Sequence, residues 1–315
     1  MVSPRPASAA LLRALRRTGL TTQSASRAAA TSPPLRTGSR PAVAAAAAAA
    51  SAAAPLEWRR PSSTYSSVSP EEVEHFNILA ADWWDPHGSS RLLHLMNPLR
   101  HNFIHDCLAS QPEGPGPTPP TRFLDVGCGG GIFAESAARL PDTAKVTAVD
   151  PTPGVLAIAK GHARRDPALR GKLEYKAATI ETLPIPSKAE DLYDVVSVFE
   201  VVEHVSSPAE FLDRCAPFVR PGGWLVGSTI ARTWTSWFTT NLIAEDILGI
   251  VPKGTHDWRK YINDNELKGM FMGGKGWEMP RVMGVVYVPG LGWKEVRGSE
   301  KVGNYFFGVR RAAAA

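Results

Sequence analysis

The first 60 residues of this 315-residue chain contain almost no acid. They hold nine arginines, no lysine and a single acidic side chain, Glu57. The remaining residues carry 26 basic against 29 acidic side chains, so the overall charge of +5 comes from the amino-terminal segment. The body of the chain therefore lacks the basic surplus that nucleic-acid binding requires, and we expect no nucleic-acid partner.

Cysteine and long apolar runs are also scarce. Cys107, Cys128 and Cys215 are odd in number and scattered, so they predict neither a disulfide framework nor a paired-cysteine metal site. This usage suits a reducing compartment. No run of about eighteen uncharged apolar residues is present, so the sequence predicts no membrane-spanning helix.

Residues 1–60 are rich in alanine, serine and arginine. Residues 8–20 can form an amphipathic helix, in which three leucines oppose three arginines. This composition is typical of a removable organelle transit peptide, disordered in the precursor, and the early arginines favour the mitochondrion over the plastid. The alternative is a low-complexity tail that carries no address.

The rest of the chain predicts an α/β fold. Residues 70–110 read as a helical extension and residues 111–121, rich in proline and glycine, as a linker. Residues 122–311 then alternate short apolar runs with helical periods, which indicates a parallel sheet with helices on both faces. The expected strands are 122–126, 145–149, 172–177, 191–199 and 223–230, and the expected helices are 132–140, 153–165 and 208–219. Two further strand-like runs, 277–288 and 304–310, follow.

A glycine-rich turn follows the first expected strand, where residues 124–131 read LDVGCGGG. Glycines let the backbone approach a ligand closely beneath a helix N-terminus. A dinucleotide loop has the spacing G-x-G-x-x-G, whereas Gly127, Gly129 and Gly131 are spaced G-x-G-x-G. That spacing, with the carboxylate of Asp125, favours S-adenosylmethionine. Taken alone, the turn is equally consistent with a structural loop.

A second signal comes from the end of the next strand. Asp150 lies about twenty residues beyond the loop, where an acid accepts hydrogen bonds from ribose hydroxyls. Ile180, after the third strand, is expected beside the adenine ring. The alternative for Asp150 is an exposed carboxylate at a strand end. With loop and acid in register, the sequence predicts a class I S-adenosylmethionine-dependent methyltransferase core, a Rossmann-like doubly wound sheet.

The fourth strand is followed by three ionisable residues, Glu200, Glu203 and His204. On a helical turn these spacings would place them on one face. Two carboxylates and an imidazole suit Mg²⁺, Mn²⁺ or Zn²⁺. A similar turn in other methyltransferases serves packing or proton transfer, so both interpretations stay open.

Residues 76–270 resemble the ubiquinone-biosynthesis O-methyltransferase family. The matching motifs are WWD at 83–85, LH at 93–94, NPLR at 97–100, LDVGCGGGI at 124–132, EHV at 203–205 and VPKGTHD at 251–257. The resemblance implies S-adenosylmethionine contacts at Arg100, Gly127, Asp150 and Phe199. It also implies a divalent cation, which we expect to be Mg²⁺, at Glu200, Glu203 and His204.

The family's substrates are catechol-like rings with a polyprenyl tail: polyprenyl-dihydroxybenzoate and demethylubiquinol, methylated on a ring hydroxyl. A phenol is protonated at neutral pH, and coordination to a cation would lower its pKa and orient its oxygen. His204 could instead be a general base, although one ring nitrogen cannot both bind metal and take the proton. We rank the ligand role first.

Residues 234–251 form an aromatic-rich amphipathic stretch. It is either a lid that also contacts the bilayer interface or an ordinary helix packed on the sheet, and a lipid substrate favours the first. By resemblance, the partners are other enzymes of a coenzyme Q synthesis complex, and the location is the matrix side of the mitochondrial inner membrane, as a peripheral protein. Two alternative functions stay open: methylation of another small catechol, and a non-catalytic scaffold.

Overall fold

The computed structural model describes residues 66–88, 90–110, 120–233, 261–274 and 276–313. The expected transit peptide, almost all of the linker and the stretches 234–251 and 251–257 therefore lie outside the described residues. Among the helices within these ranges, none has the length and apolar character needed to cross a bilayer.

The expected helical extension forms two helices. Ser69 caps α1 (Pro70–Leu79) by accepting a hydrogen bond from the backbone N–H of Glu72, and Pro70 occupies the first turn. A short 3-10 turn (Ala80–Asp82) and a bend follow before α2 (Arg91–Ala109). The helices and the sheet belong to one compact unit, Ala53–Ala315, so the extension is not a separate domain.

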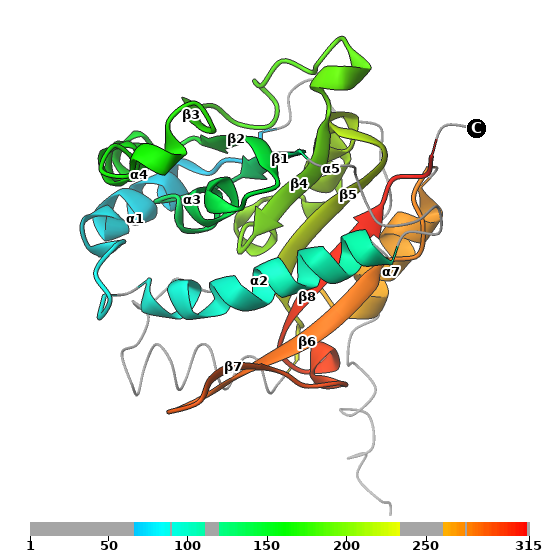
Figure 1. Ribbon diagram of the computed structural model, residues 1–315. Helices are drawn as coiled ribbons and strands as arrows, with labels where there is room; N and C mark the ends of the chain where they lie inside the picture. Colours follow the sequence, from blue (N-terminus) through cyan, green and yellow to red (C-terminus); the bar gives the residue numbers. More distant parts are fainter. Residues whose placement is uncertain (1–65, 89, 111–119, 234–260, 275, 314–315) are drawn as a thin grey trace, which may run out of the picture. The chain divides into compact units, whose positions relative to one another are not determined.

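Five parallel strands form one half of the sheet (Figure 1). They are β1 (Thr121–Val126), β2 (Thr143–Asp150), β3 (Leu173–Ala177), β4 (Tyr193–Phe199) and β5 (Val219–Ile230). The helices α3 (Ile132–Arg139), α4 (Pro153–Ala163) and α5 (Pro208–Cys215) connect them. Every residue of β4 is buried, as expected for a central strand covered on both faces. The predicted strands and connecting helices are confirmed, most of them to within two residues at each end.

The remaining three strands of the sheet are antiparallel to their neighbours, and the last strand of the chain, β8 (Asn304–Arg310), lies next to β5 rather than at the edge. The full order is β3-β2-β1-β4-β5-β8-β6-β7. The strand β8 lies between β5 and β6 (Arg281–Val288) and is antiparallel to both. The short strand β7 (Gly292–Glu295), which the sequence did not reveal, forms a hairpin with β6.

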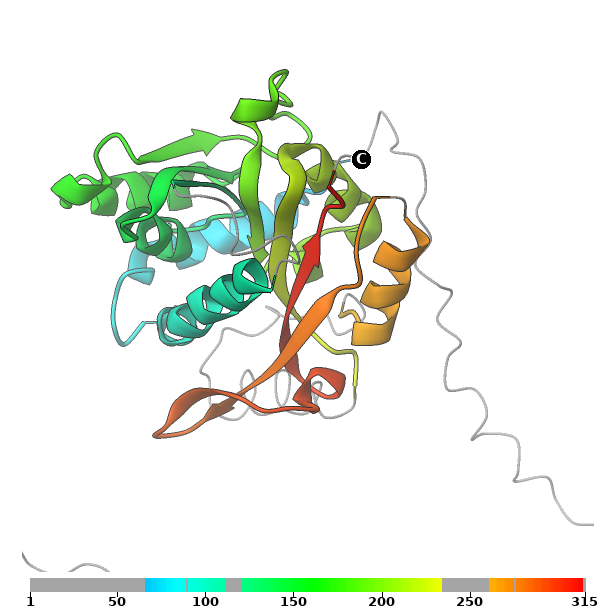
Figure 2. The ribbon, with the colours of Figure 1, turned by 45° about the vertical axis from the view of Figure 1, so that its right-hand side comes forward.

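Helices cover both faces of the sheet. The buried side chains of α2 and α3, including Phe103 and Phe133, pack with Phe306 on one face. Those of α5 and α7 (Asp264–Gly273), including Phe271, pack with Phe307 on the other. Figure 2 shows α2 and α7 on opposite sides of β6 and β8. A capping box between Asn263 and Glu266 begins α7, which sequence reasoning missed.

Candidate functional site

The glycine-rich turn lies at the carboxyl end of β1, as predicted. Its backbone N–H at Gly129 donates a hydrogen bond of 2.9 Å to Oδ2 of Asp150. Gly129 has φ 51°, and a Cβ atom there would come within 2.5 Å of the Trp83 ring. Only glycine fits this backbone conformation and this close approach. The conformation of the turn is therefore held by the hydrogen bond to Asp150 and by the packing of Trp83.

Asp150 uses both carboxylate oxygens to organise the loop ends. Oδ1 accepts a hydrogen bond of 2.8 Å from the backbone N–H of Thr152, while Oδ2 accepts the one from Gly129. Burial raises the pKa of Asp150, and these two backbone hydrogen bonds oppose the rise. The acid is thus fixed at the end of β2, beside the turn, where a nucleoside ligand would meet it.

Two buried ionisable side chains, Asp125 and Arg100, lie beside the loop. Asp125 accepts a hydrogen bond of 2.7 Å from the hydroxyl of Ser197, whereas its Oδ2 is buried and has no partner within the described ranges. Burial raises the pKa of Asp125 to about 7, and the Ser197 hydrogen bond and Arg100 offset part of that effect. Arg100 is buried too, with its guanidinium carbon 4.9 Å from the centre of the Phe199 ring.

The expected helical face of Glu200, Glu203 and His204 is wrong. Only Val202–His204 form a 3-10 turn, and Glu200 precedes it with a left-handed φ of 55°. Such a φ is uncommon outside glycine and is frequently held by tertiary contacts at functional sites. Here Ser228 accepts from the backbone N–H of Glu200 at 2.9 Å and donates to its carboxylate.

Glu203 is the most buried member of this acidic group. It is 4% exposed, and its Oε2 has no hydrogen-bond partner in the part of the chain that the structure covers. Burial, together with the charge of Glu200, raises the pKa of Glu203 to about 7, while His204 opposes the rise. Burial beside a second carboxylate therefore favours the protonated form of Glu203.

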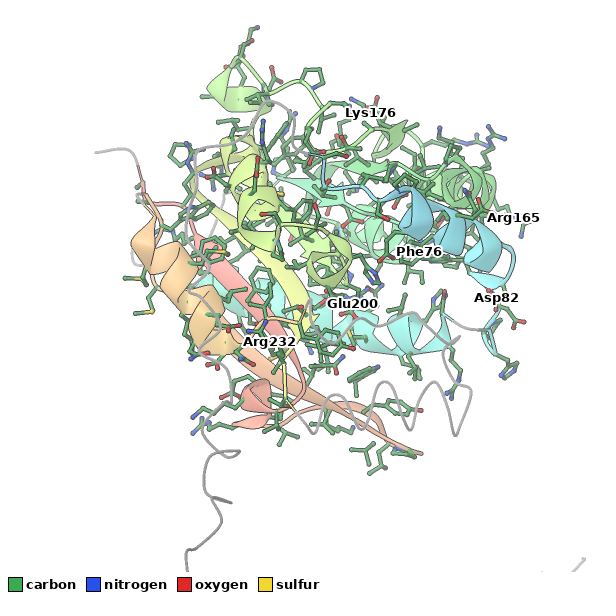
Figure 3. All side chains as sticks on the ribbon, turned by 180° about the vertical axis from the view of Figure 1, so that it is seen from behind. Phe76, Asp82, Arg165, Lys176, Glu200 and Arg232 are labelled. Carbon is green, nitrogen blue, oxygen red and sulfur yellow. The ribbon has the colours of Figure 1, made fainter. Side chains whose placement is uncertain are left out.

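His204 is directed toward α1. Its Nδ1 lies 3.1 Å from Oε2 of Glu72, and its ring meets Phe76 edge-on with the ring centres 5.2 Å apart. Figure 3 labels Phe76, on α1, and Glu200, which follows β4; both line the cavity described below. Because Glu72 lies 132 residues earlier, no local sequence pattern indicates this contact.

The described side chains do not form a metal site. Among them, no group of three or more His, Cys, Asp or Glu residues is arranged to hold a metal ion. The Nδ1 of His204 faces Glu72, and one oxygen of Glu200 is taken by Ser228. The unpartnered Oε2 of Glu203 is a feature that suits a cation. The three residues therefore fit a metal only in part.

A single cavity of about 600 Å³ connects these features. Ten of the eleven residues singled out from the sequence line it: Arg100, Asp125, Gly127, Gly129, Asp150, Ile180, Phe199, Glu200, Glu203 and His204. Gly131 is not among the lining residues. It caps α3 with φ 88°, and a Cβ atom there would come within 2.0 Å of the Tyr175 hydroxyl. The turn therefore requires glycine at this position, and the contact of Gly131 with the cofactor stays a prediction.

Sequence reasoning placed Arg100 of α2 in this site but missed the part that α1 and the turn after it play. Trp83 and Glu72 line the cavity, and the indole N–H of Trp84 donates a hydrogen bond of 2.9 Å to the carbonyl of Gly130. The WWD motif at 83–85 was the available signal, because two adjacent tryptophans in a polar extension require an apolar surface to pack against.

Comparison with known proteins agrees with this geometry. A family model described as "Methyltransferase domain" matches residues 124–227, which run from β1 into β5. The ubiquinone biosynthesis O-methyltransferase of Schizosaccharomyces pombe, named as mitochondrial, is 42% identical over 254 residues, which are 79% of this chain and 89% of that protein. The Candida albicans protein of the same name is 37% identical over 78% of this chain and 86% of its own length. The chain belongs to the ubiquinone biosynthesis O-methyltransferase family.

Family membership confirms the central expectations. The chain is an S-adenosylmethionine-dependent O-methyltransferase of ubiquinone biosynthesis. The mitochondrial names of its fungal relatives support a mitochondrial location. A solved structure of the plantazolicin methyltransferase BpumL, in complex with SAH, matches 76% of this chain and 98% of its own, with a TM-score of 0.52 and 16% identity. That likeness shows the class I fold alone.

Proposed function

We propose that this methyltransferase acts on catechol rings that carry a polyprenyl tail. The methyl group of S-adenosylmethionine passes to a ring hydroxyl of polyprenyl-dihydroxybenzoate and demethylubiquinol intermediates. The observation that carries the proposal is the shared cavity, in which the glycine turn with Asp150 borders the same space as Glu203 and His204. A cofactor at the turn would hold its methyl group close to an acceptor beside the histidine.

His204 supplies a route for the acceptor's proton. When Glu72 accepts a hydrogen bond from Nδ1–H, the tautomer leaves Nε2 with the lone pair. Nε2 could then take the phenol proton as the phenol oxygen attacks the methyl carbon that bound S-adenosylmethionine would supply, and S-adenosylhomocysteine would be the leaving product. General bases of this kind contribute about 10²–10⁴-fold to a rate. The Glu72 contact favours the base role, which the sequence alone ranked second.

Asp125 and Arg100 would set the electrostatics of the cofactor end. S-adenosylmethionine carries a sulfonium, an ammonium and a carboxylate. The unpartnered oxygen of Asp125 and the buried guanidinium of Arg100 offer opposite charges to such groups. The remaining proposed contacts are Gly127, Gly129, Ile180 and Phe199, all of which line the cavity.

A divalent cation, expected to be Mg²⁺, remains part of the proposal. Bound at Glu200, Glu203 and His204, it would lower the pKa of a coordinated phenol. As the side chains stand, the three residues do not converge on one point that could hold a cation, so the steps above assign no role to a metal. Exhaustive chelation tests the cation directly: full activity in the metal-free enzyme would remove it.

We also propose peripheral attachment to the matrix side of the inner membrane, and assembly with other enzymes of coenzyme Q synthesis. The lipid nature of the substrate is the support. A chain beginning at Pro61 should keep its activity in vitro and fail to enter mitochondria. If this truncated chain loses activity or stability, residues 1–60 have a structural role instead.

The activity is tested with methyl-labelled S-adenosylmethionine and a short-chain prenyl catechol, with and without Mg²⁺. Label in the methylated ring supports the proposal. Equal turnover of catechols without a tail would favour the alternative of another small acceptor. Cofactor binding without transfer to any catechol would favour the scaffold.

A further inference from the structure

The cavity extends well beyond the cofactor turn and the acidic group. Its far part lies between the start of α2, where Leu92, Leu93 and Met96 line it, and the hairpin of β6 and β7, where Val285, Val286 and Trp293 line it. We call this part the distal wing. The mechanism described above uses none of its residues.

The two walls of the distal wing are tied together by polar bonds. The indole N–H of Trp293 donates a hydrogen bond of 3.0 Å to the backbone carbonyl of Leu92. The guanidinium of Arg91 donates to the hydroxyl of Tyr287 at 3.4 Å, and the Tyr287 and Trp293 rings lie 5.5 Å apart. The polar atoms of both aromatic side chains are thus hydrogen-bonded to α2, and these bonds hold the hairpin against the helix.

Charge is distributed unevenly along the cavity. Its described lining residues of the Asp, Glu, Arg, Lys and His types are Glu72, Arg100, Asp125, Asp150, Glu200, Glu203 and His204, all outside the distal wing. Between Ser90 and Met96, and on the hairpin, no described lining residue is of these types, and Tyr287 adds one neutral hydroxyl. One end of the cavity therefore suits a charged cofactor and a reacting hydroxyl, whereas the other suits hydrocarbon.

We propose that the distal wing binds the first isoprene units of the acceptor's tail while the ring lies beside His204. This assignment rests on the proposed function and adds the place where the tail is recognised. Hydrocarbon burial is favourable in proportion to area, so the wing makes the specificity constant rise with tail length and gives the hairpin of β6 and β7 a role in substrate choice.

The test compares two equivalent substitutions on the hairpin. Val286 lines the distal wing and is 37% exposed, whereas Val296 is 43% exposed, lies just beyond β7 and is not among the lining residues. We would measure kcat/KM of wild type, Val286→Asp and Val296→Asp with 3,4-dihydroxybenzoate and with its farnesyl derivative. The ratio of the two constants reports tail recognition alone.

The expected result is that Val286→Asp lowers this ratio at least tenfold, because a carboxylate in the wing opposes hydrocarbon burial, and that Val296→Asp leaves the ratio within twofold of wild type. An unchanged ratio in Val286→Asp, or equal losses in both variants, would overturn the proposal. If wild type methylates neither acceptor, the proposed function itself fails, which is a separate outcome.

A second measurement does not depend on how the variants fold. A catechol whose farnesyl chain carries a diazirine would be photolysed on the wild-type enzyme with S-adenosylhomocysteine present, and the labelled peptides identified by mass spectrometry. Label within residues 90–96 or 281–295 supports the distal wing as the tail site. Label confined to peptides outside both ranges would overturn it.

Discussion

The carboxylate of Glu72 on α1 lies 3.1 Å from the Nδ1 of His204, which follows β4. The two residues are 132 residues apart in the chain and meet at the wall of the cavity. A carboxylate at this distance selects the ring tautomer and stabilises the imidazolium that forms when Nε2 takes a proton. The helix α1 is thus part of the reacting end of the site.

We expect Glu72→Gln to lower kcat by about 10- to 100-fold, a fraction of the whole effect of a general base, with little change in the KM for S-adenosylmethionine. The double variant Glu72→Gln/His204→Ala should be scarcely worse than His204→Ala, since residues that act as a unit are not additive. Steady-state kinetics check both statements. Full additivity of the two losses would show that Glu72 acts independently of His204.

The tryptophan that packs on the glycine turn allows a sharp comparison of two glycines. A Cβ at Gly130 would lie 2.2 Å from Cδ1 of Trp83, whereas a Cβ at Gly161 in α4 meets nothing within 4 Å. We expect Gly130→Ala to displace the turn and weaken S-adenosylmethionine binding at least tenfold by calorimetry.

Gly161→Ala is the control for this substitution. It should leave cofactor affinity unchanged and raise the free energy of unfolding by about 0.5–1 kcal/mol, because alanine is favoured inside a helix. Equal cofactor affinities in the two variants would mean that Trp83 does not constrain the turn.

Cofactor binding should release a proton near pH 6. Burial raises the pKa of Asp125 to about 7, so its carboxyl is mostly protonated there in the free enzyme. A cationic ligand favours the ionised form and lowers this pKa. Calorimetry in two buffers of different ionisation enthalpy measures the release. Asp125→Asn should abolish it, and an undiminished release in that variant would assign the proton to another group.

The pH dependence of stability should report Glu203. Its folded pKa, about 7, exceeds the ordinary value of 4.5, so the folded state binds the proton more tightly than the unfolded chain. This contribution to stability is complete below about pH 4.5, falls as pH rises to about 7, and then levels off.

Glu203→Gln should reduce the fall in Tm between pH 5 and pH 7.5 by several degrees, since about 1 kcal/mol corresponds to 2–4 °C in a domain of this size. Thermal denaturation of both proteins at the two pH values is the measurement. An identical fall in the variant would exclude Glu203 as the group responsible.

The sequence predicted what depends on local signals. The parallel strands have short apolar runs, the cofactor turn has closely spaced glycines, and Asp150 ends its strand, so each is visible within a few residues. The contact of Trp83 with Gly129 and that of Glu72 with His204 depend on how distant segments pack, which no local pattern specifies.

The acidic group shows that a tertiary contact can also override a local pattern. The spacing of Glu200, Glu203 and His204 suggested a helical face, but Ser228, on the neighbouring strand β5, holds Glu200 in a left-handed conformation before the turn begins. The strand β7 was missed because four residues are too few for a recognisable alternation. The capping box of α7 was a readable signal that went unused.

The strand β8 pairs with β5 along its whole length, although residues 231–303 separate the two in the chain. Residues 231–303 contain the hairpin of β6 and β7, and they begin and end at the paired strands β5 and β8. The cofactor turn and Asp150 lie outside residues 231–303, and so does the pairing of β5 with β8. We therefore expect changes in the hairpin of β6 and β7 to alter the choice of acceptor while the methyl-donor end stays the same.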